Sequence, residues 1–143
     1  CERDLPIGMC LDTAHTFAAG YSLQTESGFR RTMRTIDECV GHEKVRVIHF
    51  NDSKVPFGSN VDRHWHIGLG EIGATSLGRV ARFRKLAHAP IILETPEDGT
   101  HTETWNLNQV RSMIGIAELP EPVMDSAPPA RRGRAAAGRP ARR

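Results

Sequence analysis

Acidic and histidine side chains gather directly after the apolar runs of this sequence, and their types are those that bind divalent metal ions. Six of them form the candidate ligand set: Asp12, His15, His49, Asp62, His64 and Glu94. Carboxylate oxygens and imidazole nitrogens suit Zn²⁺, with Mn²⁺ as a second candidate. No cysteine belongs to the set, which favours a catalytic site over a structural thiolate site. Six ligands exceed the needs of one catalytic ion, so at least two ions are indicated, as is typical of phosphodiester hydrolysis.

Each candidate ligand also has an ordinary structural explanation. Asp12 could cap a turn that follows it, and Glu94 could be a carboxylate at a strand edge. A single histidine is more often a core or surface residue than a ligand, and we interpret His42, His88 and His101 in that way. The three histidines of the candidate set differ from these, because each accompanies a carboxylate on the same predicted face.

The elements that must position these side chains are three apolar runs, which predict buried strands over residues 5–11, 44–50 and 90–93. A helical pattern follows each run, over residues 26–39, 74–86 and 102–116. This repeat predicts a parallel three-stranded sheet with helices on one side, and no hairpin between the first two strands. Because the carboxyl ends of parallel strands converge on one face, the candidate ligands should cluster there.

The apolar residues at helical spacing predict which face of each helix is buried. In the first helix they are Phe29, Met33, Ile36 and Val40, and in the second they are Leu77, Val80, Ala81 and Phe83. In the third helix they are Trp105, Leu107, Val110 and Ile114. A stripe of this kind is the side of a helix that packs against the core.

The length of the chain limits the fold. Its 143 residues suffice for one domain with a core, whereas a complete eight-stranded α/β barrel takes about 250 residues. We therefore expect an α/β fold that forms part of such a barrel over residues 1–119. Residues 120–143 are rich in Pro, Ala and Arg and have no apolar period, which predicts a disordered basic tail.

Charge and cysteine usage narrow the class of protein further. Residues 126–143 hold six arginines and no acid, so the rest of the chain carries more acidic than basic residues. The tail either adds salt-sensitive attraction to nucleic acid or has no specific role. Three cysteines without a CxxC pair predict reduced thiols and a cytoplasmic protein. No apolar run reaches about 18 residues, so we expect no membrane span.

The stretch Gly68–Gly73 matches the G-x-G-x-x-G pattern of dinucleotide-binding loops. That pattern requires a buried strand that leads directly into the first glycine, and residues 62–67, which begin Asp-Arg-His, cannot form one. We therefore interpret these glycines as positions where backbone approaches a phosphate or a neighbouring loop.

Three blocks of the sequence resemble the endonuclease IV family of zinc-dependent AP endonucleases: residues 8–21, residues 49–73 and residues 91–96. Their order and spacing agree over about residues 6–116, and the departures at Ala14 and Leu69 are not at ligand positions. The resemblance implies a partial TIM (β/α)₈ barrel, roughly its last three βα units, and a centre of three zinc ions. It implies that one ion is held by Asp12, His49 and Glu94, and another by His15, Asp62 and His64. The ligands of the remaining ion would come from the first half of the barrel, which this sequence lacks.

The resemblance also implies an activity in base excision DNA repair. Double-stranded DNA would be hydrolysed 5′ to an abasic site by in-line attack on the phosphate, leaving a 3′-hydroxyl and a 5′-deoxyribose phosphate. No catalytic residue beyond the metal ligands is implied, and we expect Asn51, Lys54 and Arg63 to contact the substrate. We expect a monomer that is nearly inactive without the first half of the barrel.

Two other functions remain open from the sequence. A sugar isomerase or epimerase on the same type of barrel also places acids and histidines around a divalent metal, although it needs only one or two ions. A non-catalytic DNA-binding protein would instead depend on the arginines of residues 126–143. Binding to undamaged duplex DNA would distinguish the second alternative, because a tail-driven protein has no preference for abasic sites.

Overall fold

The computed structural model describes residues 7–120 of the chain. The elements that carry the fold are, in chain order, β1 (Met9–Asp12), α1 (Thr13–Ala18), α2 (Glu26–Cys39), β2 (Val45–His49), β3 (Asp52–Ser53), β4 (His64–Trp65), α3 (Ala74–Ala81), β5 (Ile91–Ile92) and α4 (Glu103–Met113). Short 3₁₀ turns lie at His42–Lys44 and Arg84–Leu86. The predicted basic tail lies outside the described residues, apart from Pro120, as does the start of the first predicted strand.

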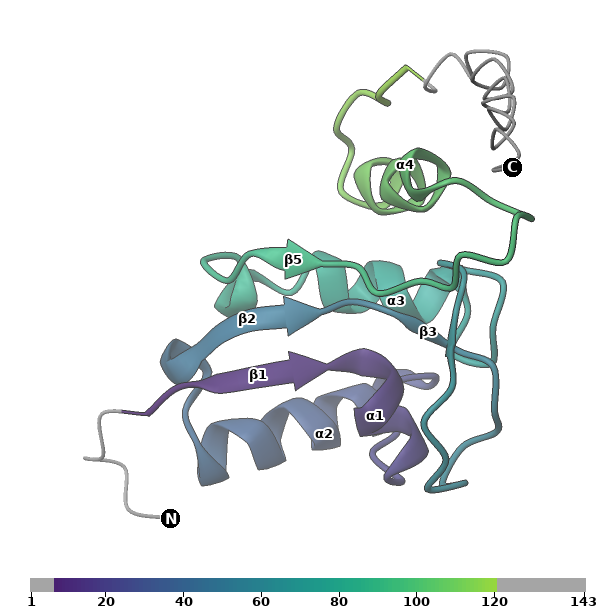
Figure 1. Ribbon diagram of the computed structural model, residues 1–143. Helices are drawn as coiled ribbons and strands as arrows, with labels where there is room; N and C mark the ends of the chain where they lie inside the picture. Colours follow the sequence, from purple (N-terminus) through teal and green to yellow (C-terminus); the bar gives the residue numbers. More distant parts are fainter. Residues whose placement is uncertain (1–6, 121–143) are drawn as a thin grey trace, which may run out of the picture.

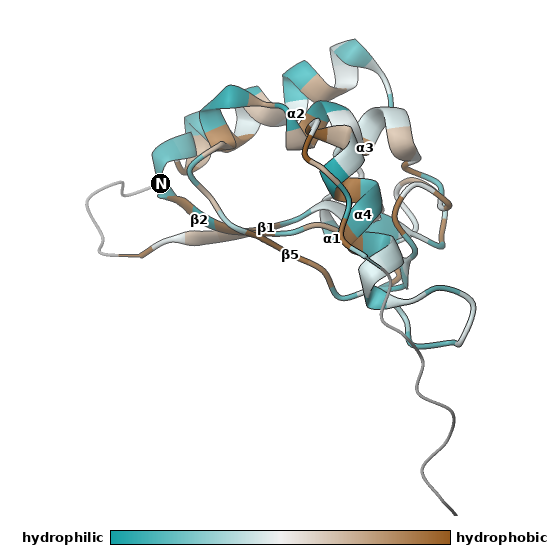
Figure 2. Cartoon of the chain, turned by 90° about the horizontal axis from the view of Figure 1, so that it is seen from above, coloured by the Kyte–Doolittle hydropathy of each residue, from teal (hydrophilic) through white to brown (hydrophobic). Residues whose placement is uncertain are grey.

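The main sheet has the strand order β1-β2-β5, and both pairs of strands are parallel. The register sets Asp12 opposite His49, and His49 opposite Ile92, so the strands end at the same edge of the sheet (Figure 1). Seen from above, α2 and α3 lie on the same side of this sheet (Figure 2). The predicted parallel sheet, with helices on one side and no hairpin between the first two strands, is confirmed. Among residues 7–120 the sheet remains open rather than closing into a barrel.

Local sequence accounts for the start and the buried face of α2. Thr25 precedes the helix in an extended conformation, and its side-chain oxygen accepts a hydrogen bond from the Gly28 N–H at 3.1 Å, which satisfies one of the free amides of the first turn. Phe29, Met33 and Ile36 are buried as their spacing predicts. Val40 lies just past the helix and is only half-buried.

The second predicted helix is shorter than the sequence suggests. Its α-helical part ends at Ala81, and residues 84–86 form a separate 3₁₀ turn. Leu77 and Val80 are buried as predicted, whereas Phe83 lies beyond the helix and packs edge-on against Phe29, with the ring centroids 5.4 Å apart. The apolar spacing was therefore right that these residues face the core, although Ala81 and Phe83 are only partly buried, and wrong about where the helix stops.

The predicted buried face of α4 was wrong at two of its four positions. Leu107 and Ile114 are each 37% exposed, whereas Asn106 and Asn108 are buried. The asparagines are buried because their amides find backbone partners: the Asn106 side chain accepts from the Ile67 N–H at 3.0 Å, and the Asn108 side chain bonds both the N–H and the carbonyl of Leu119. A helix that packs against loops can bury hydrogen-bonding side chains in place of apolar ones.

A second, two-stranded sheet was not expected from the sequence. Strands β3 and β4 pair antiparallel, with Asp52 opposite Trp65 and Ser53 opposite His64. The hairpin that these two strands form follows β2 directly (Figure 1). It brings His64 Nε2 to 3.6 Å from Asp12 Oδ2, at the carboxyl end of β1. Within residues 7–120, the longest and most apolar helices still fall short of what a membrane crossing requires.

Candidate metal centre

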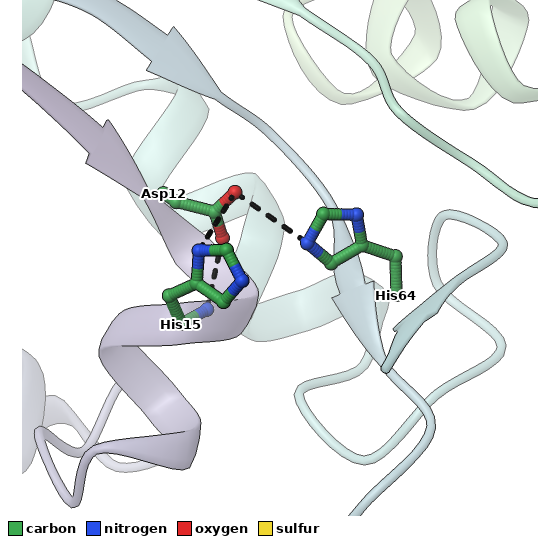
Figure 3. Close-up of side chains that lie close together, drawn as sticks. All are labelled: Asp12, His15 and His64. Atoms are coloured by element: carbon green, nitrogen blue, oxygen red, sulfur yellow. Dashed lines mark hydrogen bonds and ion pairs between the residues drawn. The ribbon is translucent and has the colours of Figure 1, made fainter. Parts of the chain in front are cut away.

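Asp12 lies at the centre of the candidate site, at the junction of β1 and α1. Its side chain is 9% exposed, and its Oδ1 accepts the His15 N–H at 2.8 Å, which caps α1. Its other oxygen, Oδ2, faces one nitrogen of each of three histidines, at 3.5 Å for His15, 3.8 Å for His49 and 3.6 Å for His64. The rings of His15 and His64 approach this carboxylate from α1 and from β4 respectively (Figure 3).

The first predicted ligand group is assembled across the three parallel strands. Asp12 ends β1, His49 ends β2 and Glu94 follows β5. His49 Nδ1 lies 2.9 Å from a Glu94 carboxylate oxygen, and one ligand atom from each of the three residues falls within 4.8 Å of the others. The convergence follows from the parallel register, because each side chain leaves its strand at the same edge.

The residues of the second predicted group lie close together, but the compact group around its histidines contains a different carboxylate. Asp62 Oδ1 lies 3.0 Å from His15 Nε2 and 3.5 Å from His64 Nε2. The ligand atoms that lie within 4.8 Å of one another are those of Asp12, His15 and His64. His15 faces Asp12 with Nδ1 and Asp62 with Nε2, so the two carboxylates approach different nitrogens of its ring. Asp12 therefore belongs to both groups. His42, His88 and His101, which we interpreted as structural, belong to neither group among residues 7–120.

The hydrogen bonding of His64 fits a metal ligand. Its Nδ1 lies 3.2 Å from the backbone carbonyl of Glu94, which can only accept, so Nδ1 carries the proton of this contact. The lone pair of a neutral ring is then on Nε2. That nitrogen is buried and has no hydrogen-bond partner among residues 7–120, although two carboxylates lie 3.5–3.6 Å away. A carbonyl that fixes the tautomer of a ligating histidine is a common feature of metal sites.

The candidate ligand atoms lie at two kinds of separation. Two atoms that are each about 2.0–2.2 Å from one tetrahedral zinc ion lie about 3.3–3.6 Å apart. The distances from Asp12 Oδ2 to His15 and His64, and from Asp62 to His64, are 3.5, 3.6 and 3.5 Å. These three separations are too long for strong hydrogen bonds and suit atoms that share an ion, whereas His15 Nε2–Asp62 at 3.0 Å and His49 Nδ1–Glu94 at 2.9 Å are hydrogen-bond distances.

The carboxylates and His15 of the site stabilise one another's charged forms. Burial lowers the pKa of His15, but its hydrogen bond with Asp62 and the nearby carboxylates of Asp12 and Glu94 outweigh burial and raise the pKa above its usual value. The same hydrogen bond lowers the pKa of Asp62. Without an ion the site therefore favours a protonated histidine between carboxylates, and a metal ion would replace that positive charge.

Two buried residues tie the strands together below the ligands. The Thr13 hydroxyl donates to the Asn51 carbonyl at 2.6 Å and accepts from the Asn51 N–H at 2.8 Å. The Asn51 amide donates to Asp12 Oδ2 at 3.4 Å, and its oxygen accepts from the Glu94 N–H at 2.8 Å. Asn51 is completely buried, so it orients the ligands of two strands rather than offering a surface to a substrate.

The other two residues expected to contact substrate are exposed. Lys54 places its ammonium group 4.0 Å from the centre of the Trp65 ring, a cation–π contact that restrains this side chain. Arg63 lies between two candidate ligands, and its guanidinium donates to the carbonyl of Asp62 at 2.8 Å. Both cations therefore stand beside the hairpin that carries His64.

His66, which was not among the predicted site residues, anchors the loop after β5. This histidine is completely buried, with Nε2 3.1 Å from Asp98 and 3.0 Å from the Thr100 hydroxyl. Its Nδ1 faces the Asn106 amide at 3.1 Å. The spacing of residues in the sequence could not predict this network, because the partners of His66 lie more than thirty residues away from it along the chain.

The hydrogen bonds around Asp98 lower the pKa of its carboxyl group, and this effect can be tested. Hydrogen bonds from the Thr100 hydroxyl and the Thr100 N–H, followed by the contact with His66, lower its pKa from 3.8 to about 2. Asp98 thus stabilises the fold above its unfolded pKa, and that contribution is lost as pH falls from 3.8 through about 2. We expect Thr100→Val to raise the Asp98 pKa toward 3.8, as measured by carboxyl ¹³C NMR. A pKa that stays near 2 in the variant would contradict this assignment.

Parallel strands, outer helices and ligand-type side chains at the carboxyl edge define a class of protein: part of a parallel α/β barrel with a candidate metal centre. The chain belongs to the family of xylose isomerase-like TIM barrel proteins, which it matches over residues 4–115. It is 47% identical over 119 residues to a probable endonuclease 4 of Solibacter usitatus, covering 83% of this chain and 41% of that protein. A probable endonuclease 4 of Methanosphaerula palustris is 45% identical, covering 79% of this chain and 40% of that protein.

A solved structure gives the same result. The chain superimposes on the crystal structure of endonuclease IV from Thermus thermophilus with a TM-score of 0.70 and 39% identity, covering 78% of this chain and 40% of that one. These matches confirm the assignment to the endonuclease IV family and to a partial TIM barrel. The chain spans about 40% of the length of the relatives it matches.

Proposed function

We propose that these residues form part of a zinc-dependent endonuclease that hydrolyses double-stranded DNA on the 5′ side of abasic sites in base excision repair. The observation that carries the proposal is the pair of candidate ligand groups that share Asp12. The similarity to proteins named endonuclease 4 supports the same activity. A cytoplasmic location and a monomeric state remain part of the proposal.

The residues of the site have separable roles in this proposal. Asp12, His49 and Glu94 would hold one ion, and His15, Asp62 and His64 another, with Asp12 contributing to the second group as well. Bound zinc supplies Lewis acidity that activates water and offsets the negative charge of the attacked phosphate. The chain's own residues keep the ligands oriented: Asn51 holds Asp12 and the Glu94 backbone, and the Glu94 carbonyl holds the His64 ring. Lys54 and Arg63 offer positive charge to a DNA backbone beside the site.

The test begins with the chain as it stands. We expect the purified protein to bind at most two zinc ions, because residues 7–120 contain only the two ligand groups. We expect its nicking of a duplex with one tetrahydrofuran abasic analogue to be at least about 100-fold slower than that of the Thermus thermophilus endonuclease IV, since a missing electrostatic group costs about 3–4 kcal/mol. A third bound ion, or turnover comparable to that enzyme, would contradict the need for further ligands.

A chimera tests the function itself. Residues 7–116 would replace the matching segment of the Thermus thermophilus enzyme, and nicking of abasic and undamaged duplexes would be compared. We expect cleavage of the abasic duplex only, and loss of cleavage when His64 is replaced by Ala. A folded chimera that binds zinc but cuts neither duplex, or that isomerises sugars, would refute the proposal.

A further inference from the structure

The glycine-rich stretch 68–73 wraps around a single buried carboxylate, that of Asp52 at the start of β3. Asp52 is completely buried and follows β2 by three residues. Its oxygens accept hydrogen bonds from five backbone N–H groups, which are those of Ser53 (2.8 Å), Gly68 (3.1 Å), Gly70 (3.0 Å), Ile72 (2.9 Å) and Gly73 (3.2 and 3.4 Å). Four of these donors come from one loop, so its backbone forms a concave site for an anion.

The hydrogen-bond partners of Asp52 favour its ionised form. Every hydrogen bond found for its carboxylate is donated by a backbone N–H, so a proton on either oxygen would meet a donor rather than an acceptor. Burial raises the pKa of Asp52 above its usual value, and the hydrogen bonds from Ser53, Gly70, Ile72 and Gly73 offset only part of that rise. A charged acceptor with several amide donors is among the stronger hydrogen-bonding arrangements in proteins.

The glycines of the loop are required by the carboxylate they surround. Gly68 and Gly73 have φ values of +83° and +79°, which side chains rarely adopt. A Cβ on Gly70 would lie 2.6 Å from Asp52 Oδ1 and would also collide with the Ser53 carbonyl. The G-x-G-x-x-G pattern therefore fits the loop to an internal carboxylate.

The same carboxylate joins the loop to the hairpin of the candidate metal centre. Asp52 is paired with Trp65 across β3 and β4, and the adjacent pair is Ser53 with His64. The loop also returns to β3 through the Glu71 N–H, which donates to the Ser53 carbonyl at 2.8 Å. Displacing the carboxylate would thus release β3 and β4 from the loop on the side that holds His64.

We propose that the Gly68–Gly73 loop is an oxyanion-binding site whose resident ligand is the Asp52 carboxylate, and that this ligand fixes the hairpin so that His64 faces Asp12. The ligand class is a small planar monoanion, and the simplest external equivalent is formate. The second part of the proposal rests on the proposed metal centre, whereas the first part does not.

Chemical rescue tests the oxyanion site in the metal-free protein. Asp52→Ala removes the carboxylate and leaves its amide donors facing a cavity of the size of formate. We expect its Tm to fall by more than about 10 °C, since unmade hydrogen bonds of buried donors are costly and each kcal/mol shifts the Tm of a small domain by several degrees. Sodium formate at about 0.2 M should recover a substantial part of this loss, and sodium chloride at the same concentration should not.

Two further variants serve as controls. Asp52→Asn is also expected to be destabilised, because its amide N–H group would face the N–H donors of the loop. Its side chain has the shape of the native one and leaves no cavity, so formate should not rescue it. Asp37→Ala removes a partly exposed carboxylate that pairs with Lys85, and its Tm should respond equally to formate and chloride. If Asp52→Ala does not fold, its refolding yield in the two salts replaces the Tm. Equal effects of formate and chloride on Asp52→Ala, by either measurement, would overturn the oxyanion site.

Zinc binding tests the second part of the proposal separately. We expect Asp52→Ala to bind zinc at least about tenfold more weakly than the native chain, because residues that orient ligands typically account for about 10–100-fold in affinity. Formate should restore this affinity in parallel with the Tm. Native affinity in the variant without formate would overturn the positioning role. A native chain that binds no zinc would refute the proposed function instead, and the melting experiment would still decide the oxyanion site.

Discussion

Asp12→Ala is expected to remove zinc binding at both candidate groups, since Asp12 is the residue that they share. In the native chain the same carboxylate faces nitrogens of His15, His49 and His64. Its loss leaves two ligands in the first group and weakens the second. We expect the zinc content of the purified chain to fall close to zero, and the abasic nicking of the chimera to fall by more than about 1000-fold, since one electrostatic group alone typically accounts for about 10²–10³.

Two comparisons separate ligation from helix capping. Asp12→Asn retains an oxygen that can accept the His15 N–H and cap α1, but it removes the negative charge. It should therefore keep the native Tm more closely than Asp12→Ala while still losing zinc. Glu94→Gln alters one group only and should cost one ion. If Asp12→Ala lost no more zinc than Glu94→Gln, the shared role of Asp12 would be wrong.

Phe17→Ala is expected to be the most destabilising single change in the core beside the site. Phe17 is fully buried in α1, the helix that carries His15. The Phe17 carbonyl, which accepts the N–H groups of Gly20 and Gly58, is retained in the variant, so the expected loss comes from the side chain. Truncating a buried phenylalanine typically costs about 3–5 kcal/mol, a large part of the roughly 5–15 kcal/mol by which a domain is stable. Urea unfolding monitored by circular dichroism measures the loss.

Phe57→Ala is the matched control, because the two rings form one edge-on pair with centroids 5.4 Å apart. Phe57 is 46% exposed, so its truncation should leave little cavity and cost less than about 1.5 kcal/mol. Zinc binding should weaken in Phe17→Ala in proportion to the unfolded fraction. Equal destabilisation by the two variants would show that the buried side of α1 does not control the stability of the site.

The amino-acid sequence by itself determined the parallel sheet and the six ligand-type residues. Short apolar runs followed by helical patterns leave few topologies, because strands separated by a helix pair in parallel. Parallel strands end at one edge of the sheet. Asp12, His49 and Glu94 each lie at or just after the end of a strand, so their convergence could be predicted from local sequence. The blocks that match endonuclease 4 proteins extended that inference from chemistry to family.

Only the tertiary structure decided the contacts between distant segments whose sequence patterns do not predict that they meet. It placed Asp12 in both ligand groups, assigned buried Asn51 a supporting position, and folded the glycine-rich loop onto Asp52. It also turned α4 so that Asn106 rather than Leu107 is buried. Apolar spacing reports only which side of an element avoids water, whereas these arrangements depend on hydrogen-bonding groups that meet across 18 to 40 residues of chain. Such groups must be satisfied once buried, and which partner satisfies each of them is fixed only when the elements have packed.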